Sequence, residues 1–231
     1  MGYSLKGKTL NHKLKAVLFD MDGTILDTAG DICAAACHSA EMFGIPAFDL
    51  EQFHRRIGNG LHSIYEQITP PDFPKETLEA AYQEHRRYYP EHCTERTCFY
   101  PGMHDVLREL AARGLKLGIV SNKVETSTVK IAAHYCSDIP FEIILGNNGV
   151  RPLKPSVEVG EIACKALHVA PEEVVFLGDG DADMKFARNM GFLAVGATWG
   201  YRDRETLIDC GAQVLIDAPI ELLQLLDKEA D

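Results

Sequence analysis

No stretch of this sequence approaches the ~20 consecutive apolar residues that a membrane-spanning helix needs. Residues 1–14 also lack an apolar segment long enough for a signal peptide, and no internal repeat or low-complexity segment is visible. We therefore expect a protein that does not engage a membrane and that stays in the cytoplasm.

Positive charge is scarce in this chain. The 23 lysines and arginines are outnumbered by 34 aspartates and glutamates, which gives a formal net charge of −11. This balance argues against binding nucleic acid or an anionic membrane through bulk charge. An anionic small molecule would need a local cationic group or a metal ion. The oligomeric state is left open between monomer and dimer.

The seven cysteines include no CxxC pair, and their number is odd. That pattern fits reduced thiols in a cytoplasm better than a disulfide framework. Cys33 and Cys37 share a helical face by spacing, but two thiols without another ligand nearby make a poor metal site. We expect them to pack in the core.

The stretch around which the chain is organised runs from Lys15 to Thr28. The apolar run Ala16-Val-Leu-Phe19 predicts a buried strand of a parallel sheet, and it ends in Asp20-Met-Asp22-Gly-Thr. Alternate side chains of an extended chain share a face, so both acids point the same way at the edge where open α/β sheets bind ligands. Two carboxylates this close ionise together only beside a cation. A capped turn is the alternative for this motif taken alone.

Alternating strands and helices predict a doubly wound parallel sheet of the Rossmann-like α/β class. The first two core strands are separated by far more residues than the dozen or so that a crossover needs. The surplus is predicted to be helical, so we expect an all-helical cap at residues 29–97, inserted into a core of residues 1–28 and 98–231. The expected strands are 16–19, 115–120, 141–145, 173–177, 192–195 and 213–216; the expected helices are 28–43, 49–57, 61–68, 75–92, 104–113, 124–136, 156–167, 181–190, 205–210 and 220–228.

Three further strand ends carry polar groups suited to one site. Ser121-Asn122 is expected to end a strand and open a helix, whose N-terminus would favour an anion, although Ser121 could merely cap that helix. Lys154 stands between two prolines, which predicts a stiffly held positive charge.

The third strand end is Gly178-Asp179-Gly-Asp181-Ala-Asp183, an oxygen-rich set that suits Mg²⁺. An EF-hand loop is excluded because its sixth and twelfth positions would be Met184 and Met190. A helix start that happens to be acidic is the alternative.

The order of these motifs resembles that of the haloacid dehalogenase superfamily of phosphohydrolases. On successive strand ends the chain carries an acid pair, a Ser-Asn, a lysine and an acid cluster. The resemblance covers nearly the whole chain. Four further segments look like the phosphoglycolate phosphatase branch: Arg56-Ile-Gly-Asn-Gly60, Tyr100-Pro-Gly102, Val120-Ser-Asn-Lys123 and Thr198-Trp-Gly-Tyr-Arg-Asp203.

The resemblance implies an Mg²⁺-dependent phosphatase that acts on a small phosphorylated metabolite, with 2-phosphoglycolate as the best candidate. Asp20 would attack phosphorus and form an aspartyl-phosphate, and Asp22 would serve as general acid and base. The metal would be held by Asp20, Asp22 through its backbone carbonyl, and Asp179, with Asp183 orienting this set from outside.

The resemblance also implies a phosphate-binding set and a cap that selects the substrate. Ser121, Asn122, Thr24 and Lys154 would bind the phosphate. Substrate contacts in the cap are expected from Arg55, Arg56, Gly58 and Asn59, where an arginine would match a carboxylate; a surface arginine pair is the alternative.

Three other functions compete with this hypothesis. A phosphomutase of the β-phosphoglucomutase type shares the same motifs, but that branch carries a histidine where Ile32 stands here. A pyrophosphatase or nucleotidase could use the same core. A non-catalytic phospholigand-binding module is the least favoured, because Asp20, Asp22, Lys154 and Asp179 are all present.

Overall fold

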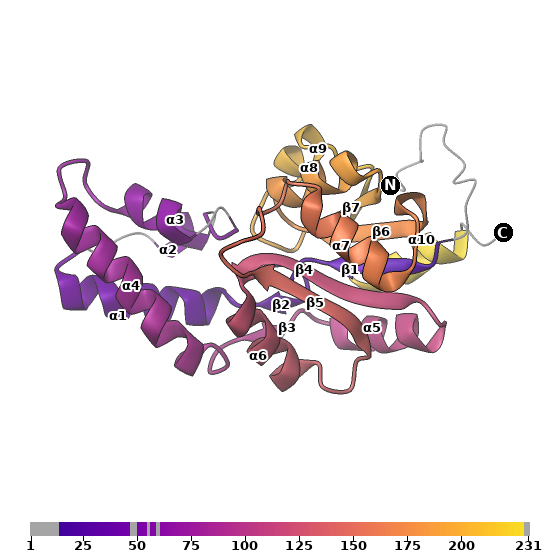
Figure 1. The fold of residues 1–231 in the computed structure, drawn as a ribbon, viewed down its shortest axis with the longest axis horizontal. Helices are drawn as coiled ribbons and strands as arrows, with labels where there is room; N and C mark the ends of the chain where they lie inside the picture. Colours follow the sequence, from indigo (N-terminus) through magenta and orange to yellow (C-terminus); the bar gives the residue numbers. More distant parts are fainter. Residues whose placement is uncertain (1–13, 47–49, 55, 59–60, 229–231) are drawn as a thin grey trace.

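A parallel six-stranded sheet forms the centre of the computed structural model, which describes residues 14–46, 50–54, 56–58 and 61–228 (Figure 1). The strand order is β5–β4–β1–β6–β7–β8. These strands are β1 (Ala16–Phe19), β4 (Lys116–Val124), β5 (Phe141–Asn147), β6 (Val174–Gly178), β7 (Leu193–Ala197) and β8 (Val214–Ile216). The predicted α/β class with a parallel sheet is confirmed.

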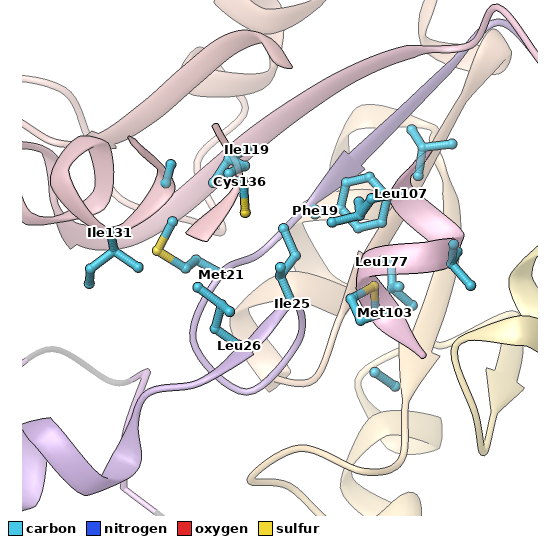
Figure 2. Close-up of a cluster of buried hydrophobic side chains, with 14 of the residues drawn as sticks. Phe19, Met21, Ile25, Leu26, Met103, Leu107, Ile119, Ile131, Cys136 and Leu177 are labelled. Carbon is cyan, nitrogen blue, oxygen red and sulfur yellow. The ribbon is translucent and has the colours of Figure 1, made fainter. Parts of the chain in front are cut away.

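Helices cover both faces of this sheet because successive strand side chains point to opposite sides. In β1, Val17 and Phe19 belong to one buried cluster, whereas Ala16 and Leu18 belong to the other. The first cluster includes residues of α5 (Met103–Ala112), α6 (Glu125–Tyr135) and α10 (Ile220–Lys228) and extends to Ile32, Phe53 and Tyr89. Figure 2 shows its part beneath the end of β1. The second is completed by α7 (Glu158–Leu167), α8 (Asp181–Met190) and α9 (Arg204–Asp209).

Four helices lie together beyond one end of the sheet (Figure 1). They are α1 (Ala29–Phe43), α2 (Leu50–His54), α3 (Leu61–Ile68) and α4 (Lys75–His92). We call them the cap helices and propose that residues 29–97 form a separate cap. A two-stranded antiparallel sheet of β2 (Leu26–Asp27) and β3 (Cys98–Phe99) joins them to the core. The sequence did not predict this pair, because two residues are too few to show a strand period.

The cap is also fastened at its base by one buried carboxylate. Asp31, in the first turn of α1, is 1% exposed and accepts hydrogen bonds from the backbone of Arg96 (2.9 Å) and Thr97 (3.0 Å) and from the Thr97 hydroxyl (2.7 Å). These contacts join the two chain segments that enter and leave the cap helices.

A hydrogen-bond chain crosses the interior of the cap. Tyr65 on α3 is fully buried, and its hydroxyl lies against Ser39 Oγ of α1 and 3.1 Å from His85 Nδ1 of α4. Ser39 Oγ can donate in turn to the Ala35 carbonyl at 3.1 Å. All these groups are satisfied when His85 is neutral and donates from Nδ1. Burial, and secondarily the charge of Lys123, lowers the pKa of His85 to about 3.

Neither a membrane-spanning helix nor a disulfide occurs in the part of the chain that the structure describes. None of its helices combines the length and the apolar character needed to cross a bilayer. All seven cysteines are unpaired. Cys33 is buried as expected, but the expectation that Cys37 packs in the core is wrong, because α1 turns its side chain towards solvent. Cys93, Cys136 and Cys164 are buried.

Removing the Asp31 carboxylate should destabilise the fold. Asp31→Ala leaves two backbone donors and one hydroxyl without their buried acceptor, which should lower the free energy of unfolding by about 3 kcal/mol. Urea unfolding would measure this loss against Asp209→Ala, which removes an exposed acid at the end of α9. Equal losses in the two variants would contradict the role of Asp31.

Stability should fall on acidification because of His85. The unfolded histidine takes up a proton near its ordinary pKa of 6.5, whereas the folded one does so only near 3. The favourable contribution is therefore present above about pH 6.5 and is lost as the pH falls from there towards 3. Between pH 7 and 5 the expected loss is about 2 kcal/mol.

Replacing His85 by glutamine should remove this part of the pH dependence. Glutamine keeps a hydrogen-bond donor, and all other titrating groups remain common to the two proteins. Denaturant unfolding at pH 7 and pH 5 would test this, with His134→Gln, at an exposed position of α6, as the matched control. Parallel pH profiles for wild type and His85→Gln would contradict the assignment.

Candidate active site

Three carboxylates meet where β1 and β6 end. Asp20 follows β1, Asp179 follows β6, and Asp183 lies in the first turn of α8. Because β1 and β6 are neighbours in the sheet, their carboxyl ends lie together, and the backbone N–H of Asp20 donates to the Leu177 carbonyl at 2.9 Å. One oxygen from each acid lies within 4.8 Å of the others, and all three residues are buried. Such a cluster is costly unless positive charge accompanies it.

Lys154 supplies one positive charge to this cluster. Its Nζ lies 2.9 Å from Asp20 Oδ1 and 2.7 Å from Asp183 Oδ1, and it donates to the Val120 carbonyl at 2.8 Å. The Asn122 side chain holds the lysine backbone, accepting from its N–H at 2.8 Å and donating to its carbonyl at 3.2 Å. The lysine is thus held at both ends of its side chain.

One lysine does not neutralise three buried acids. Burial, opposed by Lys154 and reinforced by Asp183 and Asp22, raises the pKa of Asp20 to about 6. Burial and the charges of Asp183 and Asp20 raise the pKa of Asp179 to about 8. The pKa of Lys154 is also raised, because the two acids outweigh the effect of its burial. The site therefore carries more negative charge than Lys154 alone can balance.

The donor set fits a hard divalent cation. Carboxylate oxygens are the ligands that Mg²⁺ takes in proteins. Asp20 Oδ1 is buried, and Lys154 Nζ lies 2.9 Å from it. Asp179 is oriented by the Thr24 hydroxyl (2.9 Å) and the Tyr201 N–H (2.8 Å). Asp183 was expected to orient the metal ligands without binding the metal, but its carboxylate belongs to the same cluster as those of Asp20 and Asp179.

Close backbone approach around Asp179 requires glycine. Gly23 has φ of 80°, and a Cβ there would overlap the Asp179 carboxylate. A Cβ at Gly200, on the loop after β7, would overlap the same side chain. Two loops distant in sequence can therefore close on Asp179 only because neither carries a side chain at these points.

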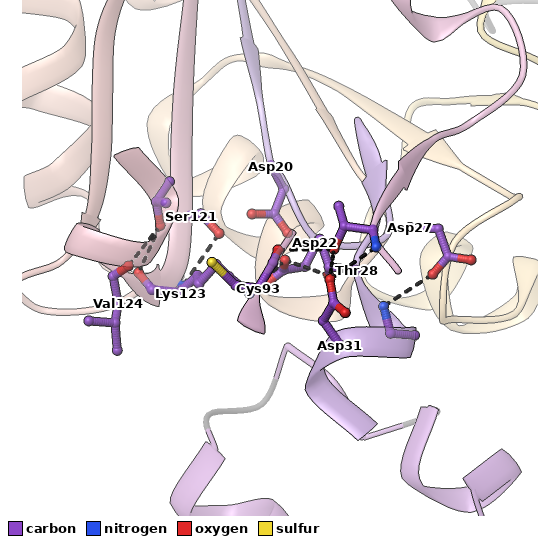
Figure 3. A network of polar contacts seen from close by, with 12 residues as sticks. Asp20, Asp22, Asp27, Thr28, Asp31, Cys93, Ser121, Lys123 and Val124 are labelled. Carbon is purple, nitrogen blue, oxygen red and sulfur yellow. Dashed lines mark hydrogen bonds and ion pairs between the residues drawn. The ribbon is translucent and has the colours of Figure 1, made fainter. Parts of the chain in front are cut away.

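Asp22 has different partners from the acidic cluster. The Thr28 hydroxyl donates to its Oδ1 at 2.6 Å, and Lys123 Nζ donates to both carboxylate oxygens at 3.0 and 3.1 Å (Figure 3). The helix expected from residue 28 begins at Ala29, and the hydroxyl of the preceding Thr28 binds Asp22 rather than the helix N-terminus. The Asp22 carboxylate is thus oriented apart from the possible metal ligands.

The expected helix 124–136 is present as Glu125–Tyr135, but the expectation that Ser121-Asn122 ends the strand and opens this helix is wrong. β4 continues to Val124, which pairs with Asn147 after a register shift, and α6 begins at Glu125. Ser121 therefore lies inside a strand and cannot offer a helix N-terminus to an anion. It is 6% exposed and lines the cavity over the acids, so its hydroxyl remains available there.

The other predicted site residues divide into three groups. Thr24 is fully buried beside Asp179 and is not among the described residues that line the cavity, unlike a phosphate-binding group. Gly58 lines the cavity, whereas Arg56 is partly buried and does not. Arg55 and Asn59 lie outside the described residues.

A cavity of about 580 Å³ lies between the acids and the cap helices. Its floor includes Asp20, Asp22, Ser121 and Lys154. Its cap side mixes apolar and aromatic residues with polar and charged ones. They include Ile32, Leu61, Ile64, Tyr82, Tyr89, His62, Glu66, His85 and Arg86. A cavity lined by apolar groups with a few polar and charged ones is typical of a small-molecule site.

Sequence reasoning assigned no role to several residues that build the site. Lys123 binds Asp22, Tyr201 holds Asp179, and the Trp199 indole donates to the Thr24 carbonyl at 3.1 Å. Tyr201 and Trp199 lie in the segment 198–203, whose sequence resembled that of the phosphatase branch. That resemblance was the available signal for them, but it could not specify their partners.

The arrangement matches a known family over most of the chain. The model of the haloacid dehalogenase-like hydrolase family matches residues 17–197, and the chain belongs to this family.

The chain is similar to enzymes named for phosphate ester hydrolysis. A phosphoglycolate phosphatase of Chromobacterium violaceum is 31% identical over 217 residues, which cover 92% of this chain and 96% of that protein. An N-acetylmuramic acid 6-phosphate phosphatase of Pseudomonas aeruginosa is 30% identical, with 94% and 96% covered. A crystal structure from Lactobacillus delbrueckii subsp. bulgaricus, described as a phosphoglycolate phosphatase, superposes with a TM-score of 0.86 at 26% identity and covers 93% of this chain and 99% of its own.

Mg²⁺ should stabilise the protein through the acidic cluster. A ligand at 100 times its dissociation constant adds about 2.7 kcal/mol, which for a protein of this size raises the unfolding midpoint by roughly 5–10 °C. Asp179→Asn should lose most of this rise because it removes a charged ligand. Thermal unfolding with and without Mg²⁺ measures the effect.

Asp181→Asn is the matched control for this experiment. Asp181 lies two residues from Asp179, but its carboxylate contacts Lys185 (3.2 Å) and Arg202 (3.7 Å) and is not part of the cluster. Its variant should keep the Mg²⁺ response. The same response in Asp179→Asn and wild type would place the cation elsewhere.

Proposed function

We propose that this chain is a cytoplasmic, Mg²⁺-dependent phosphatase that hydrolyses a small phosphorylated metabolite through an aspartyl-phosphate on Asp20. The observation that carries the proposal is the convergence of Asp20, Asp22 and Lys154 on the floor of one cavity. A nucleophile, an acid–base group and a fixed cation are what phosphoryl transfer to a carboxylate requires.

The cation would be held by Asp20, Asp179 and Asp183, with the backbone carbonyl of Asp22 as a further oxygen. When bound, Mg²⁺ supplies positive charge that offsets the repulsion between the attacking carboxylate and the phosphate. The raised pKa values of Asp20 and Asp179 support this, because they record a site short of positive charge.

The chain's own residues account for both chemical steps. An Asp20 oxygen attacks phosphorus as the bond from phosphorus to the leaving oxygen breaks, and Asp22 gives its proton to the departing alkoxide. Water then attacks the phosphorus of the aspartyl-phosphate while Asp22 takes a proton from it. Inorganic phosphate leaves, and both acids return to their starting forms.

In this proposal, the groups around Asp20 bind the phosphate. Lys154 would stabilise the charge on the equatorial phosphoryl oxygens, and the Ser121 hydroxyl with the Asn122 backbone would hold them. The Asn122 side chain serves the same end indirectly, because it holds the Lys154 backbone. In the cap, we propose substrate contacts from Gly58 together with Arg55, Arg56 and Asn59.

The leading substrate candidate is 2-phosphoglycolate, supported by the names of the relatives. A phosphorylated sugar acid is the second candidate, because a cavity of about 580 Å³ leaves room beyond a two-carbon leaving group. Ile32, which lines the cavity, stands where the mutase branch carries a histidine, so hydrolysis is favoured over isomerisation.

A phosphatase screen with Mg²⁺ tests the proposal. Release of inorganic phosphate would be measured over phosphorylated acids, sugars and nucleotides and pyrophosphate, including 2-phosphoglycolate, glucose 6-phosphate and N-acetylmuramic acid 6-phosphate. A single preferred monoester is expected. Turnover of pyrophosphate or nucleotides alone, or sugar-phosphate isomerisation without phosphate release, would select a rival function.

Two substitutions separate the roles of the acids. Asp20→Asn should abolish turnover of every phosphate ester, because no carboxylate remains to attack phosphorus. Asp22→Asn should lower kcat by roughly 10²–10⁴-fold while leaving substrate binding largely intact. Steady-state kinetics measure both, with Asp209→Asn as an exposed control. Full activity of Asp20→Asn would remove the covalent mechanism.

A further inference from the structure

Lys123 is a second buried cation on the floor of the cavity, and the mechanism above does not use it. Its side chain is 7% exposed, and its Nζ binds both oxygens of Asp22, whose side chain is 12% exposed. In Figure 3 Lys123 and Thr28 approach the Asp22 carboxylate from opposite sides. The acid therefore has one charged partner and one hydroxyl donor, and the charged partner contacts both of its oxygens.

An irregularity in β4 places this lysine. The pairing of β4 with β5 shifts between Val120 and Val124, so Lys123 lies in a stretch that leaves the regular register. Bulges of this kind re-aim side chains beside active sites. Gly146 of β5 permits the distortion, because a Cβ there would overlap the backbone of Glu125 and come within 2.8 Å of the Lys123 carbonyl.

The cap holds the other side of the lysine. Lys123 Nζ lies 4.5 Å from the centre of the Tyr89 ring, which belongs to α4 and is 6% exposed. An ammonium over an aromatic face is attracted by the ring quadrupole, and more strongly when both groups are desolvated. Tyr89, Lys123 and Asp22 all line the cavity. A continuous contact therefore runs from a cap helix to the proposed acid–base group.

The Tyr89 hydroxyl takes no part in the contact with Lys123. It is buried and has no hydrogen-bond partner among the described residues. An unpaired buried hydroxyl lowers stability. The aromatic face is thus the part of Tyr89 that meets Lys123, which makes phenylalanine and leucine an informative pair of replacements.

We propose that Lys123 is a positioning residue that holds the Asp22 carboxylate towards the leaving oxygen, and that the Tyr89 ring of the cap holds Lys123. The proposal rests on the function proposed above. It assigns the cap a part in orienting the acid–base group in addition to enclosing the substrate.

Leaving-group dependence tests this role. The alkoxide of 2-phosphoglycolate needs a proton as it departs, whereas p-nitrophenolate is a weak base that leaves without one. Because kcat/KM reports steps up to phosphoryl transfer, it isolates the departure of the leaving group from the later hydrolysis. Lys123→Met should lower kcat/KM for 2-phosphoglycolate by at least about 10-fold more than for p-nitrophenyl phosphate. Lys123→Arg should restore part of the difference, because it retains the charge.

Substitutions in α4 provide a second test at a distance from the acid. Tyr89→Leu should shift the ratio of the two kcat/KM values in the same direction as Lys123→Met, by roughly 3-fold, the equivalent of losing a modest cation–π contact. Tyr89→Phe should keep the wild-type ratio because it keeps the ring. Tyr88→Leu is the matched control: its ring stacks between His38 (4.0 Å) and His92 (3.9 Å) and does not line the cavity.

The outcomes distinguish this proposal from the proposed function. If the screen selects another alkyl monoester, that substrate replaces 2-phosphoglycolate in the comparison. If the wild type hydrolyses no phosphate monoester with Mg²⁺, the proposed function fails and the role of Lys123 fails with it. If the wild type hydrolyses both but Lys123→Met and Tyr89→Leu lower the two kcat/KM values equally, only the positioning role is overturned. Unfolding midpoints confirm that each variant is folded, and the Tyr89 variants decide the matter if Lys123→Met does not fold.

Discussion

The main physical constraint on this structure is the repulsion among the carboxylates that the fold brings together at one edge of the sheet. Asp20, Asp179 and Asp183 come from three places in the sequence and are buried with their oxygens within 4.8 Å of one another. Such a group survives burial only with compensating positive charge. Lys154 supplies part of it, and the raised pKa values of Asp20 and Asp179 record the part that is missing. This deficit is the physical basis of the proposed cation site.

Two lysines at the floor of the cavity supply positive charge to different carboxylates. Lys154 contacts Asp20 and Asp183, whereas Lys123 contacts Asp22 alone among the acids. Two carboxylates one residue apart in sequence are thereby placed in different electrostatic surroundings. In the mechanism that we propose, that separation would let neighbouring acids take different roles, one as a nucleophile and one as a proton carrier.

The core holds this arrangement rigidly, and the cap helices pack against the core. The acids follow strands whose side chains are packed between helices on both faces of the sheet, and Gly23 and Gly200 let two loops close on Asp179. The cap helices join the core through a pair of two-residue strands, through the hydrogen bonds of Asp31, and through a shared buried cluster to which Ile32, Phe53 and Tyr89 belong. Tyr89 also meets Lys123 of the core.

Much of the site could be predicted from local sequence alone. Apolar runs ending in acids marked the strands that carry Asp20 and Asp179, and the rule that parallel strands share a carboxyl edge brought them together with Lys154. The helices 61–68, 75–92, 181–190 and 220–228 were predicted with the bounds that the structure has. Periodicity sufficed there because each helix repeats its apolar face over several turns.

Other features depended on contacts that no local pattern records. The extension of β4 past the expected end at residue 120 to Val124 comes from pairing with β5 after a register shift, and it places Ser121 inside the strand. The choice of Thr28 and Lys123 as partners of Asp22, and of Tyr201 as a partner of Asp179, required distant segments to be placed first. The sequence by itself determined which chemical groups stand at the strand ends, because strand period and turn chemistry are local. Only the tertiary structure decided which of these groups touch, because charge pairing and close packing act between residues that are far apart along the chain.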